Sequence, residues 1–379
     1  MSSPTPPIPP SSSHNPLSLF TASLTFNAEI PSMPFLVDAF GPGSAHIDCR
    51  SFFCTHFHSD HYGGLGPKWD RGPRCSIYCS RITRNLLERR LRVQGHLLQE
   101  LEVGVPREVE GVLVTALEAN HCPGAVMLLF EPRDRQPVLH TGDFRFTRAM
   151  MIDPRWARLQ SMVGRCRLIL DTTYCSPEYT FPLQQDLLGR VVEAVRAEAF
   201  NVDGSWNHGT LFLFGTYTLG KEAVFLEVAR ALRKPVYVGL AKKEVLDCLE
   251  LPEQDRRLLT TDDQATNLHV VPLMSINRQR IAALLQHYKG RFNCAIGFKL
   301  TGWSQAGMQR AGPATVLKRT QCRDKTSGTI VLYEVPYSEH SSFEELREFV
   351  RWFRPLHITP SVGNDGGPKL QEMLLRLKS

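Results

Sequence analysis

The chain has 379 residues, carries 44 Lys and Arg against 38 Asp and Glu for a formal net charge of +6, and is 42% hydrophobic. This ordinary globular composition excludes a wholly disordered chain, and the length allows two or three domains or one large domain with an insertion. Ten cysteines without a Cys-x-x-Cys pair exclude a disulfide scaffold and give no support to a zinc ribbon. No apolar run reaches membrane-spanning length, so we expect no integral membrane segment.

The first 28 residues contain no Asp, Glu, Lys or Arg, and the first sixteen include six Pro and five Ser. Such a segment cannot bury enough apolar surface to fold. We therefore predict a disordered tail over residues 1–28. A plastid-type leader, which is also Ser-rich and free of acids, is the alternative.

Short, closely spaced apolar runs follow, and turn residues separate several of them. They predict strands at 35–37, 51–55, 112–117, 125–130, 137–139 and 167–170. One helix is expected among them, over 80–93, because its apolar residues fall on one face. Residues 29–181 should thus form a strand-rich first part of a core.

The pattern changes to α/β over residues 182–305. Helices are predicted at 183–199 and 221–232, and strands at 211–214 and 236–238. A strand, a helix and a strand in this order form a βαβ unit, which implies a parallel pair. A strand at 329–333, a helix at 342–353 and a strand at 357–360 then predict a C-terminal return over 306–379.

The strongest chemical signal is the run His56-Phe57-His58-Ser59-Asp60-His61, at the end of an apolar strand. The period of two in a strand would place His56 and His58 on one face, where both imidazoles can reach one cation. Asp60 and His61 would follow in a turn and point at a neighbouring position. Imidazole and carboxylate groups are suitable zinc ligands, so we predict a metal site here.

Three further residues complete this pattern. His121 and Asp143 each follow a predicted strand and are candidate ligands. Asp38 also follows an apolar run, and we expect it to accept a hydrogen bond from a metal-bound imidazole, because such rings need an acceptor on their other nitrogen.

The ordered set of Asp38, the His56–His61 run, His121 and Asp143 resembles the metallo-β-lactamase fold. The segments Asp171–Pro182 and Tyr337–Ser342, separated by an inserted α/β region, resemble the β-CASP nucleases. Among these, the match is closest to the DNA cross-link repair nucleases related to Artemis, Apollo and yeast Pso. It covers about residues 30–379.

The resemblance implies an αββα sandwich with a β-CASP cap and a metal-dependent 5′→3′ DNA exonuclease of DNA repair. It implies a first metal held by His56, His58, His121 and Asp143, and a second by Asp60, His61 and the bridging Asp143. In the third β-CASP motif, RNA-processing relatives have a metal-binding His where this chain has Val362. This difference favours DNA over RNA, and it predicts one tightly bound zinc and a weaker second metal, for which Mg or Mn is also suitable.

The chemistry that fits is phosphodiester hydrolysis, in which zinc generates a nucleophile from water and stabilises the added negative charge. We assign Asp60 to the catalytic metal site. We assign His340 to protonation of the leaving oxygen, with Asp171 orienting its ring and raising its pKa. A surface histidine at the start of a helix is the alternative for His340.

Residues Gly215–Glu222 fit the G-x-x-x-x-G-K frame of a phosphate-binding loop, between a strand and a helix. Glu222 replaces the Ser or Thr that would hold Mg²⁺, so we do not expect an ATPase. We expect the helix N-terminal amides with Lys221, Thr216 and Ser338 to bind the terminal phosphate of a 5′-phosphorylated strand, single-stranded or damaged.

Residues 71–96 contain seven Arg and only one acidic residue, Glu88. The helix at 80–93 would expose Arg84, Arg89, Arg90 and Arg92. A solvated helix face and a patch that follows a DNA strand are both open interpretations. An RNA endonuclease of the same superfamily is the main alternative function; a small-molecule hydrolase and a non-enzymatic DNA-binding scaffold are weaker ones. Nuclear localisation is implied by the family.

Overall fold

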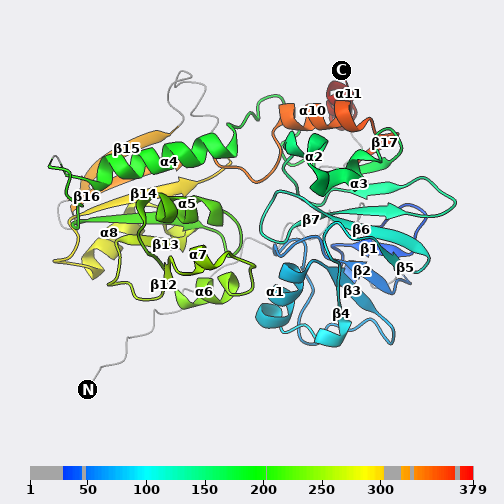
Figure 1. The fold of residues 1–379 in the computed structure, drawn as a ribbon, viewed down its shortest axis with the longest axis horizontal. Helices are drawn as coiled ribbons and strands as arrows, with labels where there is room; N and C mark the ends of the chain where they lie inside the picture. The colour runs from blue at the N-terminus through cyan, green and yellow to red at the C-terminus, as the bar shows by residue number, and fades with distance from the viewer. Residues whose placement is uncertain are drawn as a thin grey trace.

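The computed structural model of the protein describes residues 29–44, 48–201, 203–302, 317–324, 328–362 and 368–378. The predicted tail over residues 1–28 lies outside the described residues. The described chain forms a core, to which both its first strands and its last helices and strand belong, and an inserted cap beside it (Figure 1).

The core contains two sheets packed face to face. The first has the parallel order β1-β2-β3-β4, formed by β1 (Phe35–Val37), β2 (Ser51–Phe53), β3 (Ser76–Cys79) and β4 (Leu98–Glu100). The second has the order β17-β9-β8-β7-β6-β5, formed by β5 (Arg107–Val109), β6 (Val112–Glu118), β7 (Val126–Glu131), β8 (Val138–His140), β9 (Arg167–Leu170) and β17 (His357–Pro360). Phe35 and Phe53 of the first sheet contact Phe130 of the second, with ring centroids 5.7 and 5.1 Å apart.

Helices cover both outer faces of this sandwich (Figure 1). Helix α1 (Arg81–Leu91) packs on the first sheet, and Ser80 caps it by accepting a hydrogen bond from the Thr83 amide. The second sheet is covered by α2 (Ala149–Ile152), α3 (Ala157–Gln160), α10 (Phe343–Phe353) and α11 (Pro368–Lys378). The expected αββα sandwich is therefore confirmed, and β17 shows that the C-terminal return completes one of its sheets.

The cap is a seven-stranded sheet with the order β12-β11-β13-β10-β14-β16-β15, in which only β15 is antiparallel. Its strands are β10 (Thr210–Thr216), β11 (Val236–Val238), β12 (Leu259–Thr260), β13 (Leu268–Pro272), β14 (Cys294–Leu300), β15 (Lys318–Asp324) and β16 (Gly328–Val335). Its helices are α4 (Gln184–Ala199), α5 (Glu222–Leu232), α6 (Leu240–Leu246), α7 (Glu253–Arg256) and α8 (Arg278–His287). In β10, Leu211 and Leu213 pack with α8, whereas Phe212 and Phe214 belong to the cluster that includes α4 and α5. No helix of the described residues is long and apolar enough to cross a membrane.

Two details of the expected cap need correction. The predicted βαβ strands are parallel but not adjacent, because β13 lies between β10 and β11. The cap sheet also continues past residue 305, the expected end of the insertion. Strand β16 pairs with β14 from Cys294↔Thr329 to Leu300↔Val335, so the sheet ends only at Val335.

Candidate metal centre and substrate cavity

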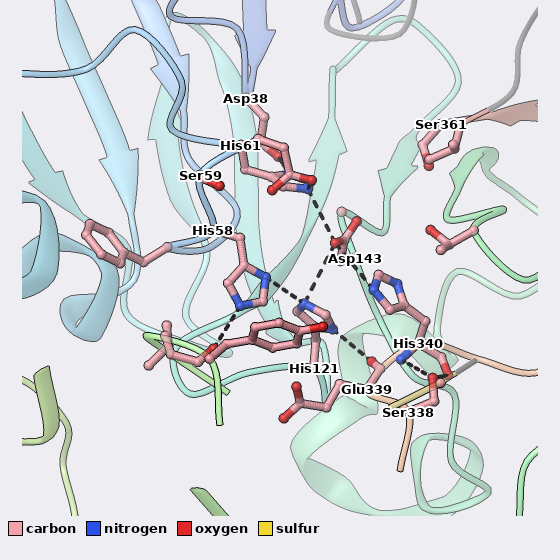
Figure 2. Close-up of a pocket in the computed structure, with 18 of the residues that line it drawn as sticks. Asp38, His58, Ser59, His61, His121, Asp143, Ser338, Glu339, His340 and Ser361 are labelled. Carbon is pink, nitrogen blue, oxygen red and sulfur yellow. Dashed lines mark hydrogen bonds and ion pairs between the residues drawn. The ribbon is translucent and has the colours of Figure 1, made fainter. Parts of the chain in front are cut away.

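A cavity of about 680 Å³ lies between the core and the cap, and five of the six predicted metal ligands line it, several of them labelled in Figure 2; the sixth, His56, is buried behind its wall. Most of its lining residues come from the segments that follow β1, β2, β6, β8, β9, β10, β14, β16 and β17. In open α/β sheets the carboxyl ends of the strands are the usual place for a ligand. The topology therefore brings residues that are distant in sequence to one place.

Four potential ligand atoms converge in the cavity: His56 Nε2, His58 Nδ1, His121 Nε2 and Asp143 Oδ2. His58 Nδ1 lies 2.9 Å from His56 Nε2 and 3.2 Å from His121 Nε2. Asp143 Oδ2 lies 3.6 Å from His56 Nε2 and 3.7 Å from His121 Nε2. Tetrahedral zinc with bonds of about 2.0–2.1 Å separates its ligand atoms by about 3.3–3.4 Å. The four measured distances are near this value. The ligand atoms of His56, His58 and His121 form one group within 4.8 Å, and Asp143 groups with His56 and His61 and with His121 and His340 but not with His58, so binding by all four requires His58 or Asp143 to move.

The hydrogen bonds of His58 and His121 determine which nitrogen of each ring is free. His58 Nε2 donates to the Leu219 carbonyl at 3.1 Å, and His121 Nδ1 donates to the Glu339 carbonyl at 2.8 Å. A carbonyl oxygen only accepts, so these nitrogens carry the protons. The lone pairs therefore lie on His58 Nδ1 and His121 Nε2, the two atoms that face the cluster.

Asp38 fixes the other two rings from behind. It accepts a hydrogen bond from His61 Nδ1 at 2.7 Å and another from the Thr55 hydroxyl at 2.6 Å. Because the Thr55 hydroxyl proton is used in this way, its oxygen accepts from His56 Nδ1 at 3.0 Å. His56 thus directs its unprotonated Nε2 at the cluster, and the Nε2 of His61 also faces it.

A second position adjoins the first at the same oxygen of Asp143. His61 Nε2 lies 3.3 Å from Asp143 Oδ2 and 3.7 Å from Asp60 Oδ2. The Asp60 side chain is 65% exposed, so it is open to the cavity and to solvent. One Asp143 oxygen facing both ligand groups has the geometry of a bridging ligand.

The electrostatics of the cluster suit a cation. Burial lowers the pKa values of His56, His58 and His121, which keeps these rings neutral, as metal ligands must be. Burial also opposes protonation of His61, but the Asp143 and Asp38 carboxylates raise its pKa well above the usual value. Burial likewise disfavours the Asp143 carboxylate, yet the neighbouring His61 and His340 hold its pKa well below its usual range.

His340 and Asp171 form a pair at the edge of this cluster. His340 Nδ1 lies 2.9 Å from Asp171 Oδ2, and its Nε2 lies 3.9 Å from Asp143 Oδ2. Burial opposes the charge of His340, but the Asp171 and Asp143 carboxylates raise its pKa to about 9. Helix α10 begins directly after this segment, with a capping box between Ser342 and Glu345. The protonated ring therefore lies between an orienting carboxylate and the candidate metal position.

Two of the three predicted phosphate-binding residues line the cavity. The Lys221 side chain is buried, its Nζ donates to the Tyr337 carbonyl at 3.1 Å, and Ser338 lies beside it in the cavity wall. Thr216 was predicted wrongly, because it is buried at the end of β10 and does not line the cavity.

The predicted cradle of helix N-terminal amides is also wrong. The Gly220 amide donates to the Glu222 carboxylate at 2.9 Å, and the Lys221 amide donates to Glu339 Oε1 at 2.7 Å. Two side-chain carboxylates thus occupy the amides that a phosphate would need. Only the Lys221 ammonium group remains as the anion-binding part of this turn.

Two further expectations differ in detail. Strand β2 ends at Phe53, so His56 and His58 lie in the loop after it and not on one strand face. Their rings converge because the loop folds over the strand ends.

Val362 follows β17 and lines the cavity, which places an apolar side chain at the third-motif position.

The arginines of α1 are partly used within the protein. Arg90 forms an ion pair with Glu244 of α6, and Arg81 pairs with Glu100 at 2.8 Å and with Glu250 at 3.2 Å. The pairs with Glu244 and Glu250 join the core to the cap. Of the two open interpretations of this helix, a patch that follows a DNA strand would have fewer arginines available, since Arg90 already has a carboxylate partner.

The sequence interpretation did not single out the Leu219 carbonyl or Glu339. Backbone carbonyl groups leave no trace in a sequence. Glu339 lies inside the Tyr337–Ser342 segment, but nothing in its side chain alone indicates a contact with the distant Lys221 amide.

Comparisons with known proteins show the family to which the chain belongs. A family model described as "DNA repair metallo-beta-lactamase" matches residues 253–366, and the "Metallo-beta-lactamase superfamily" model matches residues 48–174. The chain is 38% identical to the DNA cross-link repair protein SNM1 of Arabidopsis thaliana, over 92% of this chain and 68% of that protein.

It belongs to the DNA cross-link repair family of metallo-β-lactamase proteins. It is also 39% identical to the human DNA cross-link repair 1A protein and 33% identical to the chicken 5′ exonuclease Apollo, each over 89% of this chain. The chain spans 30% of the length of the human protein and 63% of the chicken protein.

Proposed function

We propose that the protein is a metal-dependent nuclease that hydrolyses phosphodiester bonds of DNA during DNA repair. The observation that carries this proposal is the convergence of the metal-ligand atoms beside the His340–Asp171 pair in one cavity. Hydrolysis requires a cation, which promotes attack at phosphorus, and a protonated imidazole, which protonates the departing alkoxide. DNA is the substrate because the relatives are named for DNA cross-link repair.

Zinc is the proposed metal at the first position. Three imidazoles and one carboxylate are a donor set that suits zinc. The second position offers His61 with oxygens of Asp60 and Asp143, and Val362 supplies no ligand there. This second metal should bind more weakly, and its oxygen donors also suit Mg or Mn.

When bound, the metal would supply the nucleophile from water and stabilise the added charge on the phosphate. The residues of the chain perform the remaining tasks. His340 donates its Nε2 proton to the leaving oxygen, and Asp171 holds the ring in the orientation that directs Nε2 into the cavity. Thr55 and Asp38 keep the imidazoles of His56 and His61 directed at the metal.

Lys221 and Ser338 would bind the terminal phosphate of a 5′-phosphorylated strand, single-stranded or damaged. The Lys221 side chain is only 4% exposed, so its charge is desolvated and attracts an anion strongly. A fixed terminal phosphate places the next phosphodiester at the metal and so favours 5′→3′ exonuclease cleavage. Localisation to the nucleus follows as part of the proposed role in DNA repair.

The test uses purified protein with Zn²⁺ and labelled strands of DNA or RNA, each with a 5′-phosphate or a 5′-hydroxyl. We expect 5′-phosphorylated DNA to shorten from its 5′ end, and a chelator or Asp60→Ala to stop the reaction. Lys221→Met should slow cleavage of the phosphorylated strand to the rate of the hydroxyl strand, since it removes the charge that binds the phosphate together with the hydrogen bond to the Tyr337 carbonyl. Faster cleavage of RNA would indicate the RNA endonuclease, and equal wild-type rates on both 5′ ends would rule out phosphate recognition.

A further inference from the structure

The core alone does not hold all the ligand rings. Core side chains fix His56 and His61, whereas backbone carbonyls outside the metallo-β-lactamase loops fix His58 and His121. Leu219 belongs to the 217–221 turn, which joins β10 to α5 in the cap. Glu339 lies in the segment that returns from the cap to the core. Figure 2 shows both hydrogen bonds leaving the imidazole cluster toward that side of the cavity.

Glu339 contacts both of these attachment points. Its main-chain carbonyl accepts the His121 Nδ1 proton at 2.8 Å, and its side-chain Oε1 accepts the Lys221 amide at 2.7 Å. The residue is only 7% exposed. Its carboxylate also lies against Gly220, because a Cβ atom at Gly220 would lie 2.8 Å from Glu339 Oε2.

The 217–221 turn has a backbone conformation that needs external support. Lys221 has φ of 67°, in the left-handed region, and Gly220 has φ of 105°. A left-handed conformation is sterically unfavourable for a residue with a Cβ. Lys242 also holds the turn, since its Nζ donates to the Tyr217 and Thr218 carbonyls, each at 3.0 Å. Three contacts tie this cap turn to the metal-ligand side: the bond from the Lys221 amide to Glu339, the bond from Lys221 Nζ to the Tyr337 carbonyl, and the bond from His58 to the Leu219 carbonyl.

We propose that Glu339 is a positioning residue that couples docking of the cap turn to metal binding. Its carbonyl orients His121, and its carboxylate holds the turn whose Leu219 carbonyl orients His58. Since such coupling is reciprocal, a bound metal should also stabilise the turn. The inference rests on metal binding at the cluster and does not depend on which nucleic acid is cleaved.

The first experiment measures zinc dissociation into an excess of a chelating dye, without substrate. Glu339→Ala should release zinc about ten times faster than the wild type, the usual effect of losing an outer partner of a metal ligand. Glu339→Gln keeps an oxygen for the Lys221 amide and should stay within about twofold of the wild type. The matched control is Asp255→Ala, which removes another buried carboxylate of the cap, paired with Arg230 and not in the cavity wall, and should leave zinc release unchanged.

The second experiment measures hydrogen exchange of the Lys221 amide with and without zinc. In the wild type, zinc removal should speed this exchange, whereas in Glu339→Ala the exchange should be fast in both states. Equal zinc release from wild type and Glu339→Ala, or exchange in the wild type that does not respond to zinc, would overturn the proposal. The wild-type comparison remains decisive if Glu339→Ala fails to fold. Because neither measurement uses a nucleic acid, absence of nuclease activity would refute only the proposed function.

Discussion

The histidines around the cavity have the same side chain but opposite protonation, because their neighbours differ. His56, His58 and His121 are buried among other imidazoles, which keeps them neutral. His340 is also buried, but its Nδ1 lies 2.9 Å from the Asp171 carboxylate. Its pKa is raised to about 9, so the ring is protonated at neutral pH. The first environment suits a metal ligand and the second suits a general acid.

Replacement of Asp171 tests this division of roles. Asp171→Asn removes the negative charge beside His340 and should lower its pKa. Because the acid acts only when protonated, activity is retained below its pKa and lost as pH rises through it. The alkaline limb of kcat/KM against pH should therefore move to lower pH in Asp171→Asn.

His340→Ala should lower kcat by about 10²–10⁴-fold, the usual contribution of a general acid. Zinc content should be unchanged, because four other side chains hold the first position. Loss of zinc in this variant would identify His340 as a metal ligand, and near-wild-type turnover would exclude it as the acid.

At the scale of elements, the contacts between α1 and α6 show that part of the arginine-rich helix binds the cap. Arg90 is paired with Glu244, whereas Arg89 and Arg92 are exposed and form no ion pair with a described residue. Exposed ion pairs contribute only about 0–1 kcal/mol, so these contacts orient the cap more than they stabilise it. A DNA strand would interact mainly with the arginines that remain free.

The salt dependence of DNA binding separates these arginines. Arg89→Ala and Arg92→Ala should each reduce the slope of log K against log salt by about 1, because each removes one phosphate contact. Arg90→Ala is the matched control and should leave the slope nearly unchanged. Binding is measured by fluorescence anisotropy with a chelator present, so that the strand is not cut. An equal effect of all three variants would show that the ion pair with Glu244 opens when DNA binds.

At the scale of the whole molecule, the metal position lies where the core and the cap meet. The cavity is lined from both bodies, and the chain enters the cap near Pro182 and leaves it near Tyr337. Hydrogen bonds cross between the bodies at His58 and at Lys221. A ligand that binds only the assembled cavity stabilises the folded state of both bodies.

Removal of the metal should therefore lower the thermal stability of the protein. At a free zinc concentration of 100 times Kd, binding contributes about 2.7 kcal/mol to the free energy of unfolding. We expect a chelator to lower Tm by several degrees and added Zn²⁺ to restore it, measured by differential scanning calorimetry. The variant His56→Ala, which removes a ligand of the first position, should have a low Tm that zinc does not raise. A wild-type Tm that is the same with and without the chelator would contradict a structural contribution of the metal.

Much of the architecture was predictable from local pattern. Seven of the ten described core strands and the helices α1, α4, α5 and α10 lie within a few residues of their predicted positions, because apolar periodicity and capping residues such as Ser342 act over short distances. The short strands β3, β4 and β5 were not predicted. The limits of the cap were less predictable. Strand β16 lies 28 residues beyond β14 in sequence, from Leu300 to Gly328, and only its pairing shows that it belongs to the same sheet.

In the candidate site, the residue types were likewise predictable from the sequence, whereas their contacts were not. The sequence by itself determined the candidate side chains of the site, because imidazoles and carboxylates at His56–His61, His121 and Asp143 have the composition of a metal site. Only the tertiary structure decided which groups hold these side chains by hydrogen bonds and which of the predicted binding groups do not reach the cavity. Thr216 is buried and does not line the cavity, and the helix amides donate to the carboxylates of Glu222 and Glu339. Neither therefore has its predicted role in phosphate binding. The physical reason is that tautomers, pKa values and hydrogen-bond acceptors depend on atoms brought together by folding, and many of these are backbone carbonyls, which every residue has.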